Sequence, residues 1–332
     1  MRGRGVRAGA ISRGGRRGSY DLVRTGSVES EMGFGRTRTA RRLGLWSGGF
    51  GGFEFLDTED EGLLAMMNAA STTMPDIQAS VDTRNVKIDK VGVKNIRHPL
   101  TLKTMDGGEQ TTVAEVNMYV ALPHDQKGTH MSRFMEILAE HNDALTPEDI
   151  STIAREVRER LNAEEAHIEM TFPYFTKKAA PVTGVEGLID HEVAFHAVST
   201  PSSDEMTLKV KIAATSLCPC SKEISAYGAH NQRCEITARV WFDGGLWIEE
   251  LVEMLEGAAS CSVYPILKRA DEKFVTEAAF DNPKFVEDSI RDLAVALEHD
   301  ERIVRFHIAS ENFESIHNHN AYAEIERDKR DG

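Results

Sequence analysis

Antiparallel hairpins and helix pairs alternate twice along this chain, and this repeated order constrains the fold more than any other feature. Strands are predicted where β-branched residues are enriched or alternate with polar ones, and helices where apolar residues recur at helical spacing. The first block reads strand, strand, helix, helix, strand, strand at 86–94, 111–122, 132–141, 147–161, 166–175 and 189–200. The second reads the same way at 205–214, 234–242, 247–260, a helix from 282, 302–310 and 321–327. Such blocks predict an α+β fold with antiparallel sheets and helices on one face.

Local turn and cap residues support these assignments. Asp106, Gly107 and Gly108 form a turn between the first two strands. Thr146 is a good N-cap and Pro147 suits the first turn of the helix that follows. We therefore predict two tandem modules, at residues 74–202 and 203–332.

The first 73 residues differ in composition from the rest. Residues 1–45 contain eleven Arg and three acids, so this segment carries +8, and the rest of the −14 chain carries −22. A segment so rich in Arg and Gly buries too little apolar surface to offset its ordering entropy, so we predict disorder over 1–73. A targeting peptide and a start mis-assigned upstream of Met66, Met67 or Met74 are both compatible with it. Residues 1–65 are expected to be dispensable.

The overall charge and the cysteines restrict the class of protein. A net charge of −14 argues against a general nucleic-acid binder, and an anionic substrate would need a local basic pocket. No apolar run approaches the length of a membrane span. Four cysteines, two of them in one CxC, do not form the framework of a secreted disulfide-rich protein. The predicted location is the cytoplasm.

The segment 215–233, TSLCPCSKEISAYGAHNQR, concentrates residues that can carry chemistry. Cys218 and Cys220 are two positions apart, and His230 follows ten residues after Cys220. Thiolate and imidazole bind borderline-soft metals, and a reactive thiol needs cationic neighbours to ionise. Two buried thiols at the end of a strand would satisfy the same short pattern, so the CxC alone leaves both interpretations open.

Taken whole, this segment resembles the signature of the type IB GTP cyclohydrolases. Further blocks similar to that family follow in its order: KGTHMSRF (127–134), LKRADEKFVTE (267–277), DNPKFVED (281–288) and ESIHNHNAYA (314–323). The resemblance covers the chain from about Met74 to its end. It implies tandem tunnelling-fold modules, a homotetramer with active sites at subunit interfaces, and the first step of folate-type pterin biosynthesis. In that step GTP and water give 7,8-dihydroneopterin triphosphate and formate.

The resemblance also implies a metal site. Cys218, His230 and Glu272 match the family's ligands, and Glu314 is expected to be a further ligand or an orienting carboxylate. Three protein ligands leave one position open, as catalytic metal sites require. The donor set suits Zn²⁺ and accepts Mn²⁺ or Fe²⁺. Cys220 is expected to lie beside the metal or to act in catalysis, and its role stays open.

The remaining matches concern proton transfer and substrate binding. His317 and His319 are expected to transfer protons, since the pKa of histidine lies near neutrality. Glu287 matches the family's purine-anchoring glutamate. Seven further side chains are candidates for binding the triphosphate: Lys268, Arg269, Arg233, Lys222, His130, Ser132 and Arg133. No Walker A or GxGxxG pattern accompanies them, which argues against a P-loop NTPase.

Three other functions compete with this one. An archaeal-type relative would give a cyclic phosphate product from the same substrate. A tunnelling-fold nitrile reductase would use a Cys and a Glu with a nicotinamide cofactor, and the metal set would have no purpose there. A zinc-stabilised interaction module would require a fourth protein ligand and show no turnover.

Overall fold

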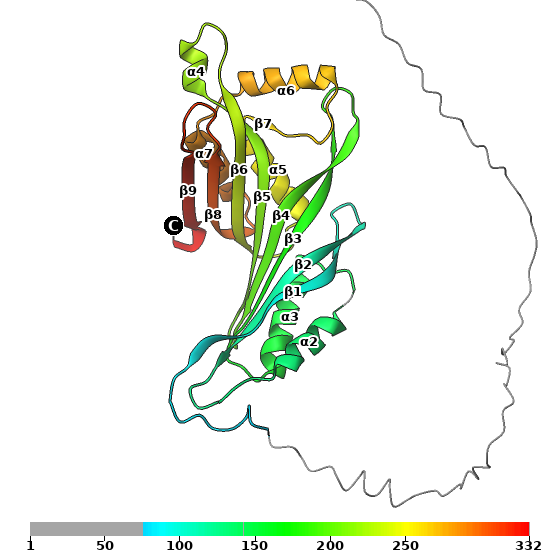
Figure 1. Ribbon diagram of the computed structural model, residues 1–332, viewed down its shortest axis with the longest axis vertical. Helices are drawn as coiled ribbons and strands as arrows, with labels where there is room; N and C mark the ends of the chain where they lie inside the picture. Colours follow the sequence, from blue (N-terminus) through cyan, green and yellow to red (C-terminus); the bar gives the residue numbers. More distant parts are fainter. Residues whose placement is uncertain (1–75, 142, 332) are drawn as a thin grey trace, which may run out of the picture. The chain divides into compact units, whose positions relative to one another are not determined.

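A single antiparallel sheet organises the computed structural model of this chain, which describes residues 76–141 and 143–331. The long strands lie in the order β1-β2-β3-β4-β5-β6-β8-β9, and the short β7 pairs with β5 (Figure 1). The strands are β1 (Ile88–Lys103), β2 (Glu109–Leu122), β3 (Ala166–Ala179), β4 (Glu186–Ser199), β5 (Asp204–Leu217), β6 (Asn231–Phe242), β7 (Cys261–Ser262), β8 (Ile303–Asn312) and β9 (Ala321–Asp328). The segment 1–73, for which disorder is predicted, lies outside the described residues.

The helices of the described region lie between these strands in the chain. They are α2 (Met131–Glu140), α3 (Pro147–Arg160), α4 (Pro219–Ile224), α5 (Ile248–Ala258), α6 (Arg269–Asp281) and α7 (Val286–His299), followed by the 3-10 turn η1 (Lys329–Asp331). None of the helices in this part of the chain is long and apolar enough to cross a membrane. The predicted strand–strand–helix–helix–strand–strand order is present in both halves, and the second half adds α4, β7 and α6, which the sequence patterns did not predict.

The two halves share one sheet because β4 and β5 pair directly. Their register runs from Glu192↔Lys211 to Ser199↔Asp204, so the chain passes from one half to the other through a tight hairpin. The order of elements alone did not show that the two predicted layers are continuous. The predicted α+β fold is confirmed, and the boundary at 202/203 stays a prediction.

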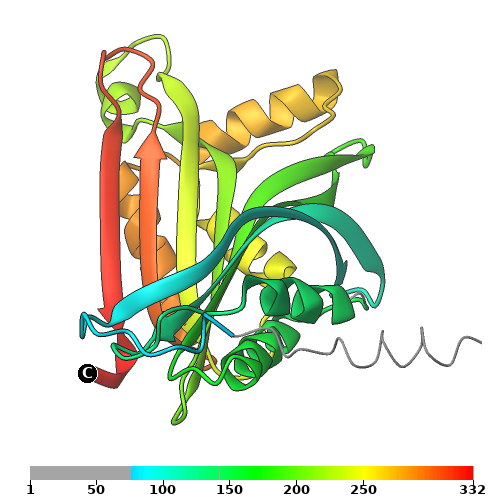
Figure 2. The same ribbon diagram turned by 60° about the horizontal axis from the view of Figure 1, so that its bottom comes forward.

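One face of the sheet carries the helices and the hydrophobic core (Figure 2). Alternate residues of each strand point to that face, as Leu208, Val210 and Ile212 do on β5, and all three are almost completely buried. Helix α3 packs on β3, β4 and β5, α5 packs on β5 and β6, and α7 packs on β8 and β9. The core therefore runs continuously beneath both halves.

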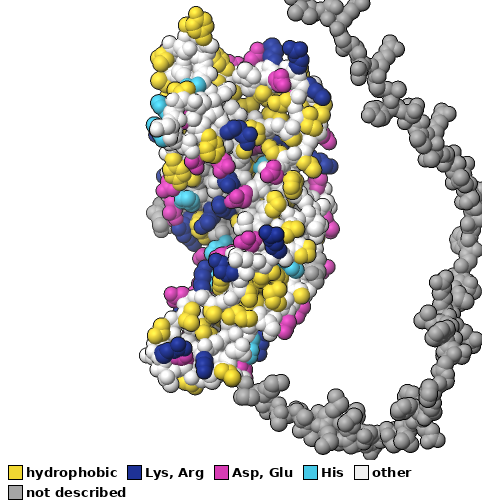
Figure 3. All heavy atoms as spheres, in the orientation of Figure 1, with side chains coloured by type: hydrophobic (Ala, Val, Ile, Leu, Met, Phe, Trp, Pro, Cys, Tyr) yellow, Lys and Arg dark blue, Asp and Glu magenta, His cyan; other side chains and the backbone are white. Residues whose placement is uncertain are grey.

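The opposite face is polar. Lys211 on β5 lies 3.0 Å from the Glu192 carboxylate and 3.6 Å from that of Glu235, on the neighbouring strands. Basic, acidic and histidine side chains are spread over this face in Figure 3. Because the helices cover only one side, each strand needs apolar residues at every second position only, and this is why alternation identified the strands.

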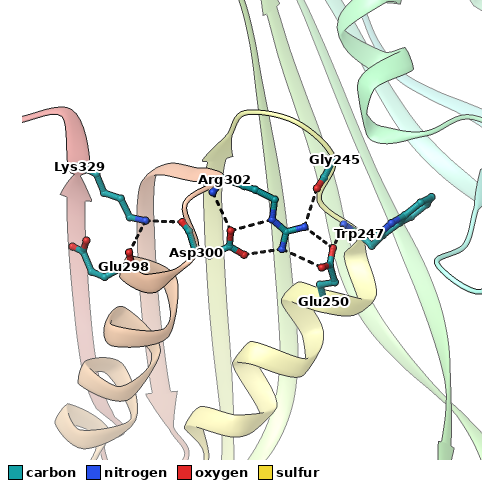
Figure 4. A network of polar contacts seen from close by, with 7 residues as sticks. All are labelled: Gly245, Trp247, Glu250, Glu298, Asp300, Arg302 and Lys329. Atoms are coloured by element: carbon teal, nitrogen blue, oxygen red, sulfur yellow. Dashed lines mark hydrogen bonds and ion pairs between the residues drawn. The ribbon is translucent and has the colours of Figure 1, made fainter.

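A network around Arg302 closes the end of the second half at which β6 ends and β8 begins (Figure 4). Its guanidinium donates to the Asp300 carboxylate at 2.7 and 3.0 Å, to the Glu250 carboxylate at 3.0 and 3.1 Å, and to the Gly245 carbonyl at 2.9 Å. Lys329 donates to the Asp300 carbonyl at 2.8 Å. These bonds tie the start of α5, the end of α7 and the C-terminal turn together.

Candidate functional site

The candidate site lies at the other end of β6 and β8, around the first residue of α4. Cys218 is the N-cap of α4, and Pro219 fills the first helical position, where a missing N–H costs nothing. The Cys218 Sγ accepts a hydrogen bond from the Ser221 N–H at 3.4 Å. The Cys218 N–H in turn donates to the His230 carbonyl at 3.2 Å, so thiol and imidazole are held on adjacent segments. Cys220, one residue into the helix from Pro219, is exposed.

The surroundings of His230 select one tautomer of its ring. The Nδ1 lies 3.1 Å from Gln232 Oε1, while the Gln232 amide nitrogen donates to Ser216 Oγ at 3.4 Å. With the Gln232 amide nitrogen directed at Ser216, its oxygen faces the ring and accepts a hydrogen bond from the His230 tautomer that carries its proton on Nδ1. The Ser315 hydroxyl also lies 3.3 Å from Nδ1. The lone pair on Nε2 is then the ring's donor for a metal, as is usual for ligating histidines.

The loop between β8 and β9 brings further site residues next to His230. Ser315, in this loop, makes the contact with the imidazole just described, and the Phe313 N–H donates to the Arg233 carbonyl at 2.9 Å. Glu314 Oε2 is buried and has no hydrogen-bond partner in the described part of the chain. A buried carboxylate oxygen without a donor is costly, which makes it a natural ligand for a cation. His317 and His319 stack with ring centroids 5.1 Å apart and are exposed.

Helix α6 carries three predicted site residues within one turn. Lys268 is its N-cap, Arg269 is the first helical residue, and Glu272 follows; all three are exposed. Between them, Asp271 is fully buried. Burial by itself would raise the pKa of the Asp271 carboxyl. The hydrogen bonds that it accepts from Thr183, Lys268 and Val182 have the larger effect, and they hold this pKa well below its ordinary value.

The other predicted substrate-binding residues of the second half have different surroundings. Glu287 lies in the first turn of α7 and is exposed, while its neighbour Asp288 accepts from the Phe285 N–H at 3.0 Å. Arg233 is exposed on β6. Lys222 donates to the Phe280 carbonyl, and its ammonium lies 4.3 Å from the centre of the Phe280 ring. Lys222 therefore also joins α4 to the end of α6.

His130, Ser132 and Arg133 lie apart from this group. His130 is the N-cap of α2 and contacts the Asp76 carboxylate at 3.1 Å. Arg133 donates to the Arg160 carbonyl at 3.5 Å. Figure 1 and Figure 2 both show α2 at one end of the sheet and α4 at the other. Within one chain the structure does not bring these three residues together with Cys218 and His230.

The donors fit a metal by their chemistry, although they are not gathered into a closed cluster. Within residues 76–141 and 143–331, no three His, Cys, Asp or Glu side chains are arranged to hold a metal ion. The fit rests on the thiol of Cys218, the tautomer of His230 and the unpaired Glu314 oxygen. Glu272 lies on a helix that must approach this group for the predicted ligand set to close.

Sequence reasoning missed two residues of this region. Gln232, which selects the His230 tautomer, sits in the same segment as the CxC, but its role depends on strand pairing that no spacing reveals. Asp271 stands inside the LKRADEK block, where it reads as an ordinary acid of a helix's first turn. Only the structure shows that it is buried against the turn between β3 and β4.

Comparison with known proteins relates this sequence to a family. The sequence profile described as "Type I GTP cyclohydrolase folE2" matches residues 74–323. The chain is 56% identical over 264 residues to a GTP cyclohydrolase FolE2 of Magnetococcus marinus, which covers 80% of this chain and 100% of that relative. It is 54% identical over 266 residues to a GTP cyclohydrolase FolE2 of Azoarcus sp., with 80% and 99% covered.

Among solved structures, the uricase of Arthrobacter globiformis superposes with a TM-score of 0.44 at 8% identity, covering 72% of this chain and 93% of the uricase.

Proposed function

The chain belongs to the type I GTP cyclohydrolase FolE2 family, and from this premise we propose that it converts GTP and water to 7,8-dihydroneopterin triphosphate and formate with a bound divalent metal. The observation that carries the proposal is the match over residues 74–323, which includes every predicted site residue. In the structure, the thiol–imidazole pair at Cys218 and His230 and the unpaired Glu314 oxygen support it.

The residues of this chain would hold the metal and leave a position for water. Cys218, His230 and Glu272 are the proposed ligands, with Glu314 as a further ligand or as a carboxylate that orients one. Zn²⁺, Mn²⁺ and Fe²⁺ all suit these donors. When bound, such an ion lowers the pKa of water and holds it near its target. Gln232 keeps the imidazole in the tautomer that this role requires.

Ring opening requires proton transfers that side chains can perform. A first water adds to C8 of the guanine and one C8–N bond breaks, which leaves a formamide. A second water releases formate from the other nitrogen, and both nitrogens take up protons. Rearrangement of the ribose and closure of the new ring then expel one water, so the net reaction consumes one. His317 and His319 are the proposed acids and bases, because they are exposed, stacked and adjacent to Glu314 along the chain. Cys220, exposed on the first turn of α4, would be a further proton donor beside the metal ligand Cys218.

Substrate binding is assigned to the starts of two helices. Glu287, in the first turn of α7, would accept hydrogen bonds from the guanine N1–H and the 2-amino group. Lys268 and Arg269 at the start of α6, with Arg233 and Lys222, would bind the triphosphate. The free N–H groups of the α6 first turn add to this attraction. The pocket would thus be locally basic on an acidic chain.

A second copy of the chain would complete the site. His130, Ser132 and Arg133 lie too far along the sheet to join Cys218 within one chain, and the start of α2 suits a phosphate. Strands β1 and β9 are the edges of the sheet and leave backbone groups for pairing. We propose a homotetramer of tunnelling-fold subunits with interfacial sites. The four cysteines are free thiols, which supports the cytoplasm as its location.

The test is turnover by the purified full-length chain. Metal-free protein is reconstituted with Zn²⁺, Mn²⁺ or anaerobic Fe²⁺ and incubated with GTP. Pterin fluorescence after oxidation and an enzymatic formate assay should rise together, in equal molar amounts. A product with the mass of a cyclic phosphate would assign the archaeal-type activity instead. Metal-dependent stabilisation without any loss of GTP would indicate the non-enzymatic module, and nicotinamide-dependent reduction of a nitrile would indicate the reductase.

A further inference from the structure

Helix α6 is attached to the rest of the molecule mainly at its two ends. Its buried residues are Asp271 near the start and Ala279 near the end, and Phe274 between them is 46% exposed. At the far end, Lys222 donates to the Phe280 carbonyl, and Asn282 donates to the carbonyls that follow α5. Since core packing contributes little along its length, the direction of α6 depends on these end contacts (Figure 1).

At the start of α6, one carboxylate receives four hydrogen bonds. Asp271 Oδ1 accepts from the backbone N–H groups of Val182 and Thr183, both at 2.9 Å. Its Oδ2 accepts from the Thr183 hydroxyl at 2.7 Å and from the Lys268 N–H at 2.9 Å. Three of these donors belong to the turn between β3 and β4, in the first half of the chain. The carboxylate is therefore saturated, and it joins the first turn of α6 to that hairpin.

The hairpin is built to receive this contact. The Ala180 N–H donates to the Val185 carbonyl at 2.9 Å and the Gly184 N–H donates to the Ala180 carbonyl at 3.0 Å, which closes the turn. Gly184 has φ +67°, a conformation that favours glycine. At Gly187, a Cβ would lie 2.7 Å from the ring of Pro265 in the segment that leads into α6. The hairpin and the start of α6 thus meet at two separate points.

We propose that Asp271 is a positioning residue, which uses the β3–β4 turn to place Lys268, Arg269 and Glu272 for the reaction. This inference rests on the proposed function, because it assigns those three residues to the triphosphate and the metal. They lie within one helical turn of Asp271, so a shift of that turn moves all three together. A part of the first half would in this way control a site that lies in the second.

The experiment compares three variants with the wild-type chain. Asp271→Asn keeps the volume but removes the charge and replaces one of the two acceptor oxygens with a donor NH₂. Thr183→Val removes one donor in the β3–β4 turn, and Thr183→Ser retains the hydroxyl. The matched control is Asp149→Asn, since Asp149 also accepts from the N-cap of its helix, Thr146, at 2.7 Å but touches no predicted site residue. Three quantities are measured: the Kd for Co²⁺ with its absorption spectrum, KM and kcat for GTP, and amide hydrogen exchange in the first turn of α6.

Loss of a group hydrogen-bonded to a metal ligand weakens metal binding by about 10- to 100-fold; Asp271 acts one step further out, through the helix, so we expect an increase in Kd at the lower end, about 10-fold, for Asp271→Asn. Thr183→Val should raise Kd and KM by a smaller factor and speed exchange at residues 268–272. Thr183→Ser should match the wild type, and Asp149→Asn should change stability without altering the Co²⁺ spectrum or KM.

The outcomes separate the two proposals. If the wild type turns over GTP while Thr183→Val and Asp271→Asn leave Kd, KM and exchange unchanged, Asp271 does not position α6 and the proposed function stands. If the wild type shows no turnover, the proposed function is wrong, and exchange alone then decides the role of Asp271: unchanged exchange in Thr183→Val overturns it. If Asp271→Asn does not fold, Thr183→Val still provides the comparison.

Discussion

The two ends of the second half differ in the groups that they bring together. At the end where β8 begins, Arg302 donates to two carboxylates and a carbonyl, and the groups around it bond to one another. At the end where β8 finishes, Glu314 has a buried oxygen without a partner and two histidines face solvent. Glu249, next to Glu250, also has a buried oxygen without a partner among the described residues, so the contrast rests on the thiol and the stacked histidines that accompany Glu314. The difference indicates that the Arg302 end serves folding and the Cys218 end serves chemistry.

The largest effect should come from removing a proposed metal ligand. Cys218→Ala deletes the thiol of a three-ligand site, which has no ligand to spare. Turnover should fall by about a thousandfold or more, beyond the ~100-fold that losing an outer partner can cost. Metal content is measured by elemental analysis after gel filtration, and turnover by pterin fluorescence.

The same variant should fold almost normally. Because Cys218 caps α4 through one weak N–H···S bond, its loss should cost less than about 1 kcal/mol in urea unfolding of the metal-free protein. Stoichiometric metal bound to Cys218→Ala would show that the ligand lies elsewhere. A large loss of stability in the metal-free Cys218→Ala protein would show that the Cys218 end also serves folding.

Glu287→Gln should separate purine recognition from metal binding. The substitution keeps the volume but turns one acceptor for the guanine into a donor and removes the charge. Hydrogen bonds to charged groups contribute about 1.5–3 kcal/mol each, so turnover should fall by about a hundredfold, which corresponds to roughly 2.7 kcal/mol. Steady-state kinetics with GTP on the metal-loaded variant measures this.

Metal content and helix content of Glu287→Gln should stay at wild-type levels. If Glu287 is only an acid in the first turn of α7, stability should fall by about 1 kcal/mol or less and turnover should be near normal. That result would move the guanine anchor to another residue.

Arg302→Leu should give the opposite pattern at the other end of the strands. It leaves Glu250 and Asp300 without their shared cation, in a region that is partly exposed. We expect the free energy of unfolding to fall by about 2 kcal/mol, between the values for surface and buried pairs. Turnover per folded, metal-loaded molecule should stay within about twofold of the wild type, well below the effect of any lost transition-state contact. A large loss of kcat at normal metal content would contradict the division between the two ends.

Much of the fold could be predicted because one covered sheet face imposes strict alternation. Met206, Leu208, Val210 and Ile212 all point to the core, and the predicted strand 205–214 lies within β5. Helix α6 was missed because its stripe of apolar residues is weak: Phe274 and Phe280 are only partly covered, and Asp271 and Ala279 are its buried residues. No periodic pattern signals a helix that is held at its ends.

The candidate site could be predicted in part. Sequence blocks identified Cys218, His230 and the 314–323 loop, and the structure places all three at one end of β6 and β8. Sequence could not give the distance of α2 from this group, because that depends on the register of the whole sheet. Nor could it distinguish Asp271 from Glu272, since adjacent acids in one helical turn differ only in the direction of their side chains.

The smallest effect concerns the acid stability of the Arg302 end. Hydrogen bonds from Arg302 hold the pKa of Asp300 below its ordinary value, although burial opposes them. Since the unfolded chain binds a proton at Asp300 more readily, this carboxylate stabilises the fold above about pH 4, and the stabilisation is lost as pH falls through the lower, folded pKa.

Asp300→Asn should therefore be less stable than the wild type at pH 7, by about 1 kcal/mol for so partly exposed a pair. That difference should shrink as the pH is lowered from 5 towards 3, because protonation removes from the wild type the charge that the variant already lacks. Urea unfolding of both proteins at pH 7, 5, 4 and 3 measures the difference directly, and carboxylates that do not share Arg302 with Asp300 cancel in it. A difference that stays constant over this range would mean that the Asp300 charge contributes nothing, and that the network acts through shape and neutral hydrogen bonds alone.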